Sequence, residues 1–171
     1  MWRRVLYHLS CVGTVELLFV FVHAESQPPF SVDFAAPAVR AQMRKAAERG
    51  DPDAQLRLGI SYLNGIGIDK DERQAVAWFR KAAEQGLAGA QFNLGAMYEL
   101  GNGKKKDGAQ AVIWYRKAAE QGLAEAQYCL SKMYGTGEGV AKDEKQALFW
   151  IRKAAAQGFA PAQEVLRRMG S

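Results

Sequence analysis

Histidine and cysteine are scarce in this sequence of 171 residues, and the scarcity limits its chemistry. The histidines are His8 and His23, and the cysteines are Cys11 and Cys129. Residues 25–171 therefore contain neither the Ser–His and Cys–His couples of nucleophilic catalysis nor a histidine-rich zinc site. They also cannot form an internal disulfide, because Cys129 has no second thiol there. We expect no enzyme activity, no catalytic residue, no cofactor and no metal.

The charge is too evenly spread to predict a nucleic-acid partner. The net charge is +5, from 23 basic and 18 acidic residues, and removal of the first 24 residues would leave +4. The densest basic stretch is the short run Lys104–Lys106, and acidic residues are mixed in throughout. Nucleic-acid binding needs a concentrated basic face. We therefore expect no nucleic-acid partner.

The N-terminal segment has the pattern of a secretory signal peptide. Basic residues precede a mostly apolar run, Val5–Val22, and small residues stand at Val22 and Ala24. We predict cleavage after Ala24 and a periplasmic or secreted protein. The alternative is an uncleaved anchor in the inner membrane, since about 18 apolar residues can span a bilayer. Glu16 disfavours the anchor, because a carboxylate inside a permanent span is costly. A membrane partner is expected only if the segment is uncleaved.

A nine-residue stretch that starts at Trp78 organises the rest of the chain. It reads WFRKAAEQG and returns as WYRKAAEQG from Trp114 and as WIRKAAAQG from Trp150, each copy 36 residues after the last. A fixed period of this length predicts a solenoid of stacked units. The predicted segments are a signal peptide (1–24), a proline-containing linker (25–37), a capping half-repeat (38–50), repeats 51–86, 87–122 and 123–158, and a capping helix (159–171).

Each unit is predicted to hold two helices. In the first unit, Asp51 and Pro52 suit the start of a helix, and a glycine-containing loop follows it. Asp71 and Gln74 resemble a capping box at the start of the second helix, and Gly86 ends that helix. The other units repeat the aspartate–glutamine pair, as Asp107 with Gln110 and Asp143 with Gln146, and they repeat the glycine-containing loop and the terminal glycine.

The tryptophans lie on the predicted buried stripe of the second helices. A tryptophan buries about 150–250 Å², and these alanine-rich helices contain little else of that size. We therefore assign Trp78, Trp114 and Trp150 to the core rather than to a ligand-stacking platform. Gly59, next to Leu58, is expected to let the two helices of the first unit approach closely.

One motif string resembles a known family. In the first unit A-x-x-x-L-G-x-x-Y begins at Ala54, a G-x-G loop follows, and K-D-x-x-x-A-x-x-W leads into K-A-A-E-Q-G, which ends at Gly86. The pattern is similar to that of the Sel-1-like repeat family, relatives of tetratricopeptide repeats, and it covers Arg44 to about Met169. The resemblance implies an all-α fold, an α/α superhelical solenoid of helix-turn-helix repeats that binds proteins or peptides on its concave side.

Family members from bacteria are often secreted or periplasmic adaptors, and together with the signal-peptide pattern the resemblance implies a bacterial adaptor of this kind. Some cysteine-rich relatives are associated with β-lactam binding. This chain lacks their paired cysteines, and it also lacks Ser-x-x-Lys and Lys-Thr-Gly motifs.

The candidate binding groove is the face of the first helices that points away from their partners. By analogy with tetratricopeptide grooves, two registers should line it, Leu56/Phe92/Tyr128 and Ile60/Ala96/Lys132, and Asn93 lies next to the first of them. An alternative for Leu56, Phe92 and Tyr128 is helix-to-helix packing between units. The predicted groove residues are Leu56, Ile60, Phe92, Asn93, Ala96, Tyr128 and Lys132.

Cys129 occupies the register of Arg57 and Asn93, so we expect it outside the core. The simplest interpretation is a partly shaded thiol without a role in a monomer. A dimer linked through Cys129 is the alternative, which a single cysteine in a secreted chain allows.

The sequence therefore favours a secreted or periplasmic adaptor that binds a protein or peptide, whose identity stays open. Two alternatives remain from other classes. One is an envelope enzyme that acts on peptidoglycan or β-lactams. The other is a membrane-tethered scaffold with an uncleaved N-terminal anchor.

Overall fold

The computed structural model describes residues 36–170, and these residues form helices and turns without a strand. The predicted signal peptide and residues 25–35 of the predicted linker lie outside this range. The all-α prediction is confirmed. The helices are α2 (Pro37–Glu48), α3 (Pro52–Asn64), α4 (Glu72–Glu84), α5 (Ala88–Leu100), α6 (Gly108–Glu120), α7 (Ala124–Thr136), α8 (Glu144–Ala156) and α9 (Ala160–Gly170).

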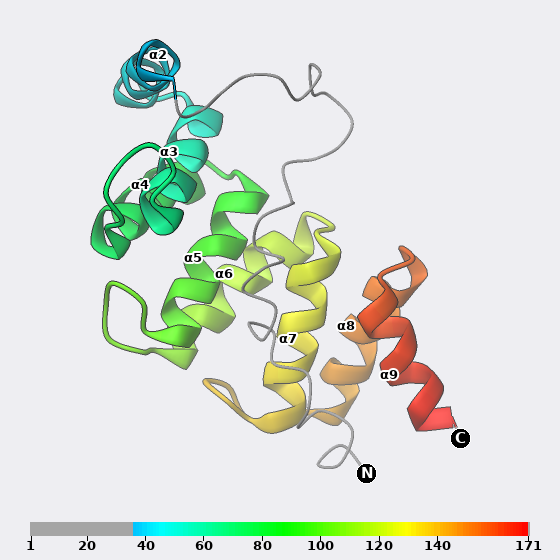
Figure 1. Ribbon diagram of the computed structural model, residues 1–171. Coiled ribbons are helices and arrows are strands. Elements are labelled where there is room, and N and C mark those ends of the chain that lie inside the picture. The colour runs from blue at the N-terminus through cyan, green and yellow to red at the C-terminus, as the bar shows by residue number, and fades with distance from the viewer. Residues whose placement is uncertain (1–35, 171) are drawn as a thin grey trace.

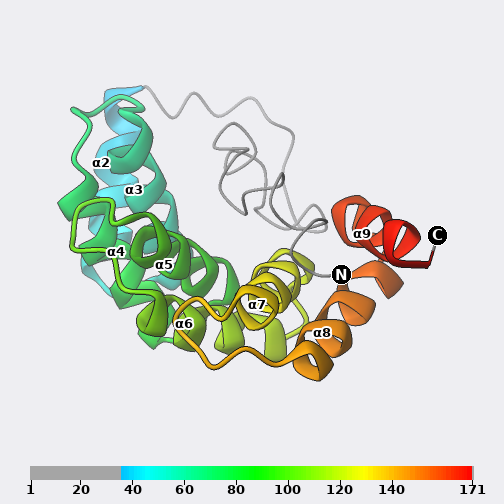
Figure 2. The ribbon, with the colours of Figure 1, turned by 90° about the horizontal axis from the view of Figure 1, so that it is seen from below.

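Consecutive helices pack as antiparallel pairs that stack along an arc (Figures 1 and 2). The pairs α3–α4, α5–α6 and α7–α8 make the repeat units, and α4–α5 and α6–α7 join one unit to the next. In Figure 2 the first helices α3, α5 and α7 line the inner side of the arc, and α4, α6 and α8 form its outer side. The chain is therefore a solenoid with an inner and an outer face.

Aspartates begin the second helices, as predicted. The Asp71 carboxylate accepts from the N–H groups of Arg73 at 2.9 Å and Gln74 at 3.0 Å. Asp107 accepts from the Gln110 N–H at 3.0 Å in the next unit. Each bond satisfies a backbone donor that the first turn of a helix leaves open.

The first helix of the described chain begins one residue earlier than predicted. Pro37, assigned to the linker, is the first residue of α2, and Ala36 is its N-cap. Proline suits this position because its fixed φ is already helical and its missing N–H would have no helical partner. Gly50 follows the helix at φ 99°, a conformation that glycine adopts without strain.

The deepest core position is one residue beyond each tryptophan. Phe79, Tyr115 and Ile151 are fully buried, whereas Trp114 and Trp150 lie at the edge of the core with 8% and 7% exposed. Trp78 is half-buried. A lysine ammonium lies over the tryptophan ring in each unit, at 4.0 Å from the Trp78 centroid in the first. The tryptophans thus cover the edge of the core, and Phe79, Tyr115 and Ile151 pack in its interior.

Two glycines of the first helices make room for those deepest side chains. A Cβ on Gly59 would lie 2.6 Å from Cδ1 of Phe79, and one on Gly95 would lie 2.8 Å from Cδ1 of Tyr115. In the third unit Ser131 takes this register, and the smaller Ile151 replaces the aromatic ring. The predicted close approach at Gly59 is therefore an approach of a side chain to a helix backbone.

A ladder of glutamines joins each unit to the next. The Gln91 amide donates to the Ala83 carbonyl at 3.2 Å, and its oxygen accepts from Nε2 of Gln121 at 2.7 Å. Gln55 and Gln127 repeat both bonds. Because the side chains of Gln55, Gln91 and Gln127 are buried, their hydrogen bonds stabilise the register between units as well as the fold.

Candidate interaction surface

Two of the predicted groove residues are part of the core between helices. Leu56 and Tyr128 are each only 5% exposed. The Tyr128 ring packs at 5.6 Å from the Phe159 ring, and the half-buried Phe92 ring packs at 5.6 Å from that of Tyr115. The prediction that Leu56 and Tyr128 line an open groove is therefore wrong. Their register faces neighbouring helices, which is the packing alternative from the sequence.

Cys129 is also buried, contrary to the prediction from its register. The residue is 2% exposed, while Arg57 and Asn93 at the same register are half-buried. Val165 follows it at this register in α9 and is 1% exposed. Small apolar side chains at this position pack inward, whereas the polar ones reach solvent. A disulfide through Cys129 would therefore require α7 to open locally.

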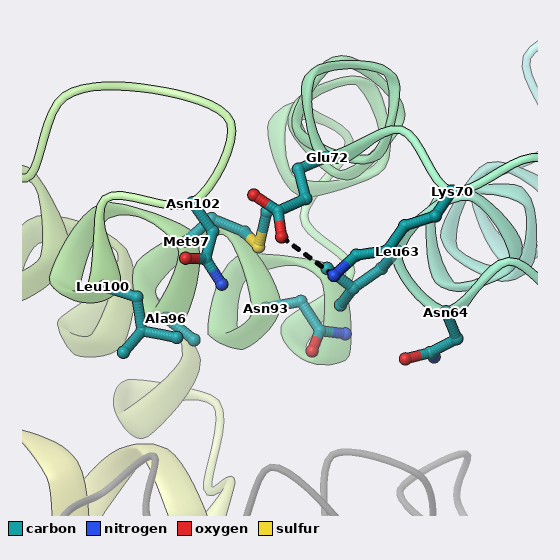
Figure 3. Close-up of a pocket in the computed structure, with 9 residues that line it drawn as sticks. All are labelled: Leu63, Asn64, Lys70, Glu72, Asn93, Ala96, Met97, Leu100 and Asn102. Carbon is teal, nitrogen blue, oxygen red and sulfur yellow. Dashed lines mark ion pairs between the residues drawn. The ribbon is translucent and has the colours of Figure 1, made fainter.

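The remaining predicted residues stay near the inner surface. Ile60, Asn93 and Lys132 are half-buried, and Ala96 is buried. Asn93 and Ala96 help to line a small pocket of about 90 Å³ between α3 and α5 (Figure 3). The pocket residues are Leu63, Asn64, Lys70, Glu72, Asn93, Ala96, Met97, Leu100 and Asn102.

This pocket combines an apolar wall with polar groups at its rim. Leu100 is 38% exposed and lies on the side of α5 away from Gly95, which faces α6. The Glu72 carboxylate lies 3.1 Å from Lys70 Nζ in an ion pair and accepts a hydrogen bond from the Gly103 N–H at 3.2 Å. Pockets for small-molecule ligands are several times larger than this one. Its size and mixed lining suit one side chain of a bound polypeptide.

A buried charged cluster lies further along the inner helices. Glu99 is 6% exposed, accepts from the Tyr115 hydroxyl at 2.7 Å and lies 3.5 Å from Lys132 Nζ. Nearby, the Lys106 ammonium pairs with Glu138 at 2.8 Å, and this hydrogen bond and charge raise the pKa of Lys106. Lys132, predicted to line the groove, thus directs its charge toward Glu99.

Glu99 is not among the predicted groove residues, although the repeat contains a signal for it. Leu63 and Gly135 hold the same register in the neighbouring units, so a glutamate there interrupts an uncharged column. Lys132 likewise replaces Ile60 and Ala96 in its column. Two charges of opposite sign that appear together in uncharged registers indicate a pair.

The described residues contain no cluster of three or more potential ligands that could hold a metal ion. Within residues 36–170, no helix has both the length and the hydropathy needed to cross a bilayer.

Comparison with known proteins identifies the repeat. The Sel1 repeat model matches residues 52–87, 88–123 and 124–159. The chain belongs to the Sel1 repeat family. The matched Sel1 segments begin one residue later than the units expected from the period. Members of this family are helical repeat scaffolds that generally mediate protein–protein interactions.

Solved Sel1 repeat structures resemble the chain. The Sel1 repeat protein from Oxalobacter formigenes is 42% identical with a TM-score of 0.71, over 76% of this chain and 98% of that one. The antigen c5321 of uropathogenic Escherichia coli, which has an SLR fold, is 47% identical with a TM-score of 0.69, over 70% of this chain. The match spans 26% of the length of c5321.

A third structure, Helicobacter pylori cysteine rich protein B, is 25% identical with a TM-score of 0.61. The match covers 81% of this chain and 99% of that one. No curated protein sequence matches the chain at a significant level.

Proposed function

We propose that this Sel1 repeat protein is an adaptor that binds a polypeptide segment on its inner face, across α3, α5 and α7. The pocket between α3 and α5 carries the proposal. It places the exposed Leu100 and the half-buried Asn93 beside the ion pair of Lys70 and Glu72, on the side of α5 away from its partner helix. An apolar anchor surrounded by hydrogen-bonding groups is the arrangement that binds peptide side chains.

The variation between units supports the inner face as the specific surface. The core registers repeat, as at Ala75, Ala111 and Ala147, because every unit must pack in the same way. The inner register of Ile60, Ala96 and Lys132 differs in each unit. Ile60 and Lys132 are half-buried, so the units present different side chains on this face.

We further propose that the adaptor works outside the cytoplasm, in the periplasm or secreted, on the basis of the N-terminal signal pattern. The intact mass of the protein recovered from cell fractions tests this. A species that begins at Glu25 is expected. A full-length species in the membrane fraction would instead support the tethered scaffold.

Substitution of the pocket tests the binding proposal. Partner polypeptides captured by the wild-type protein from the native envelope are identified, and their affinity is measured with purified components. Leu100→Glu places a charge on the apolar anchor and is expected to weaken binding about tenfold or more. The matched control is Ile113→Glu, because Ile113 is 43% exposed on the outer helix α6.

Both variants should retain the helical circular dichroism of the wild type. If Ile113→Glu weakens binding as much as Leu100→Glu, or if neither variant changes it, the inner-face assignment is wrong.

A further inference from the structure

The outer side of α8 carries a second surface, separate from the inner face. A shallow groove of about 440 Å³ runs along this helix. Its residues lie at the three- and four-residue spacings that share one helix face. Figure 2 shows α8 on the outer side of the arc. We name this surface the α8 groove, lined by Lys145, Leu148, Phe149, Arg152, Lys153 and Ala156.

The centre of the α8 groove is apolar. Phe149 is 47% exposed, and the same register holds Ala77 in the first unit and Ile113 in the second. Leu148 is half-buried, although Val112 at its register is only 4% exposed. At these two registers the third unit thus exposes larger apolar side chains than the first two units do. An exposed aromatic next to a second apolar side chain is a typical anchor point for a partner.

Arg152 lacks the partner that its counterparts have. Arg80 donates to the Tyr98 hydroxyl at 2.8 Å, and Arg116 donates to that of Tyr134. The register of these tyrosines is occupied by Gly170 in α9. Within residues 36–170, no hydrogen bond or ion pair engages the guanidinium of Arg152. This guanidinium can therefore bind a carboxylate from another molecule in a bidentate manner.

The acidic residue of the repeated motif is also missing here. Glu84 and Glu120 occupy the register that Ala156 holds in α8. Lys145 and Lys153 make no ion pair within the described part of the chain, and the Lys153 ammonium lies 4.7 Å from the Phe149 ring centroid. The groove thus presents three cations around a phenylalanine without a carboxylate in its lining.

We propose that the α8 groove binds an acidic amphipathic segment of a partner protein. An apolar side chain of that segment packs on Phe149 and Leu148, and its carboxylates pair with Arg152 and the flanking lysines. The three cations of the groove favour a segment that carries carboxylates over a neutral or basic one. The surface is distinct from the inner face, so the adaptor can hold two polypeptides at once.

Two other occupants fit the surface less well. A second copy stacked end to end would bring its N-terminal helix, with Arg40, Arg44 and Lys45 and only Glu48 as an acid, against a basic groove. An anionic bilayer is typically bound by clusters of about four to eight basic residues. The groove offers three cations, so stable attachment to a membrane is not expected.

Fluorescence anisotropy with a defined probe tests the proposal on the full mature chain. The probe is a labelled amphipathic helical peptide with leucines on one face and glutamates on the other. The same peptide with lysines in place of glutamates is the charge control, and vesicles that contain phosphatidylserine are the membrane control. The acidic peptide is expected to bind, with an affinity that falls as ionic strength rises. Neither control should bind.

Variants at matched registers locate the binding. Arg152→Glu is expected to lower the affinity for the acidic peptide about tenfold. Phe149→Ala is expected to lower it about threefold or more. Lys145→Glu should weaken binding more than Arg73→Glu, because Arg73 holds the same register on α4. Ile113→Ala is the matched control for Phe149→Ala, and Leu100→Glu on the inner face should leave peptide binding unchanged.

Absence of binding to the acidic peptide, or equal weakening by Arg73→Glu and Lys145→Glu, would overturn the proposal. Binding to the vesicles in preference to the acidic peptide would overturn it in favour of a membrane surface. Because Leu100→Glu reports on the inner face and Phe149→Ala on the outer face, the failure of one surface is distinguishable from the failure of the other.

Discussion

At the scale of single residues, pairs that face each other across helices determine the packing of each unit. The glycine at the Gly59 register and the aromatic at the Phe79 register form one such pair. In the third unit, Ser131 is larger than the glycine at its register, and Ile151 is smaller than the aromatic residue at its register. The total volume of the pair is thus kept similar. Interiors are packed densely enough that each member of such a pair depends on the other.

A double-mutant cycle at Gly59 and Phe79 tests this dependence. Gly59→Ser should destabilise the protein by about 1–3 kcal/mol, because the new side chain overlaps the Phe79 ring. The double variant Gly59→Ser/Phe79→Ile has the residues of the third unit at these positions. Its loss of unfolding free energy should therefore be smaller than the sum of the losses of the two single variants. The expected coupling free energy is about 0.5–3 kcal/mol. Urea unfolding gives the free energies. Additive losses would show that the two sites are independent.

The buried pair of Glu99 and Lys132 is a second residue-scale test. Glu99→Leu leaves the half-buried Lys132 ammonium without its carboxylate and should lower the free energy of unfolding by about 1–3 kcal/mol. Adding Lys132→Ala recreates the residues of the preceding junction, Leu63 and Ala96, and should recover part of that loss. Thermal and urea unfolding of both variants measure it. A double variant that is less stable than Glu99→Leu would contradict this account.

At the scale of helices, the glutamine ladder defines how one unit meets the next. Gln91 is 4% exposed and bonds both to the Ala83 carbonyl and to Gln121. Gln163 makes the equivalent bond to the Ala155 carbonyl at 3.2 Å, but it is exposed. A buried carbonyl that loses its donor stays desolvated without a partner, whereas an exposed one is hydrated.

Leucine substitutions separate these two cases. Gln91→Leu should lower the free energy of unfolding by about 1–3 kcal/mol, while Gln163→Leu, with the same loss of a hydrogen bond, should change it by less than about 0.5 kcal/mol. Denaturant unfolding monitored by circular dichroism provides both values. Similar losses in the two variants would show that the ladder does not depend on burial.

Much of the helical architecture could be predicted from the sequence. Asp71, Asp107 and Asp143 mark the starts of the second helices because a cap is a local interaction. The depth of Phe79 relative to Trp78 could not be predicted, since periodicity identifies a broad stripe and not its deepest residue.

The site was predicted less well because it depends on how the units stack. Leu56, Tyr128 and Cys129 face neighbouring elements only in the curved array, and the repeat period contains no information on that curvature. Asn93 and Ala96, which were predicted to line the groove, lie in the wall of the pocket. Their role in binding stays a prediction.

At the scale of the whole molecule, the chain behaves as a line of units with neighbour contacts only. The main core is continuous from Leu56 to Val165. A separate small cluster joins α2 to α3, with Met43, Ala47 and Leu58 among its residues. In such arrays each unit depends on its neighbours, so stability should be highest in the middle and lowest at weakly joined ends.

Hydrogen exchange should reveal this gradient. Amides of α6 are expected to exchange slowest, and those of α2 to exchange first, because α2 packs on a small cluster. Mass spectrometry of peptides from each helix measures the protection. Equal protection of α2 and α6 would indicate a single cooperative unit in place of a graded array.

The inner-face interaction is tested most directly by site-specific photocrosslinking in the native envelope. A photoreactive amino acid is placed at Leu100 on the inner side and, in a second protein, at Ile113 on the outer side. A crosslinked polypeptide is expected from position 100, and none of the same mass is expected from position 113. Crosslinking to the same polypeptide from position 113 alone, or none from position 100, would contradict it.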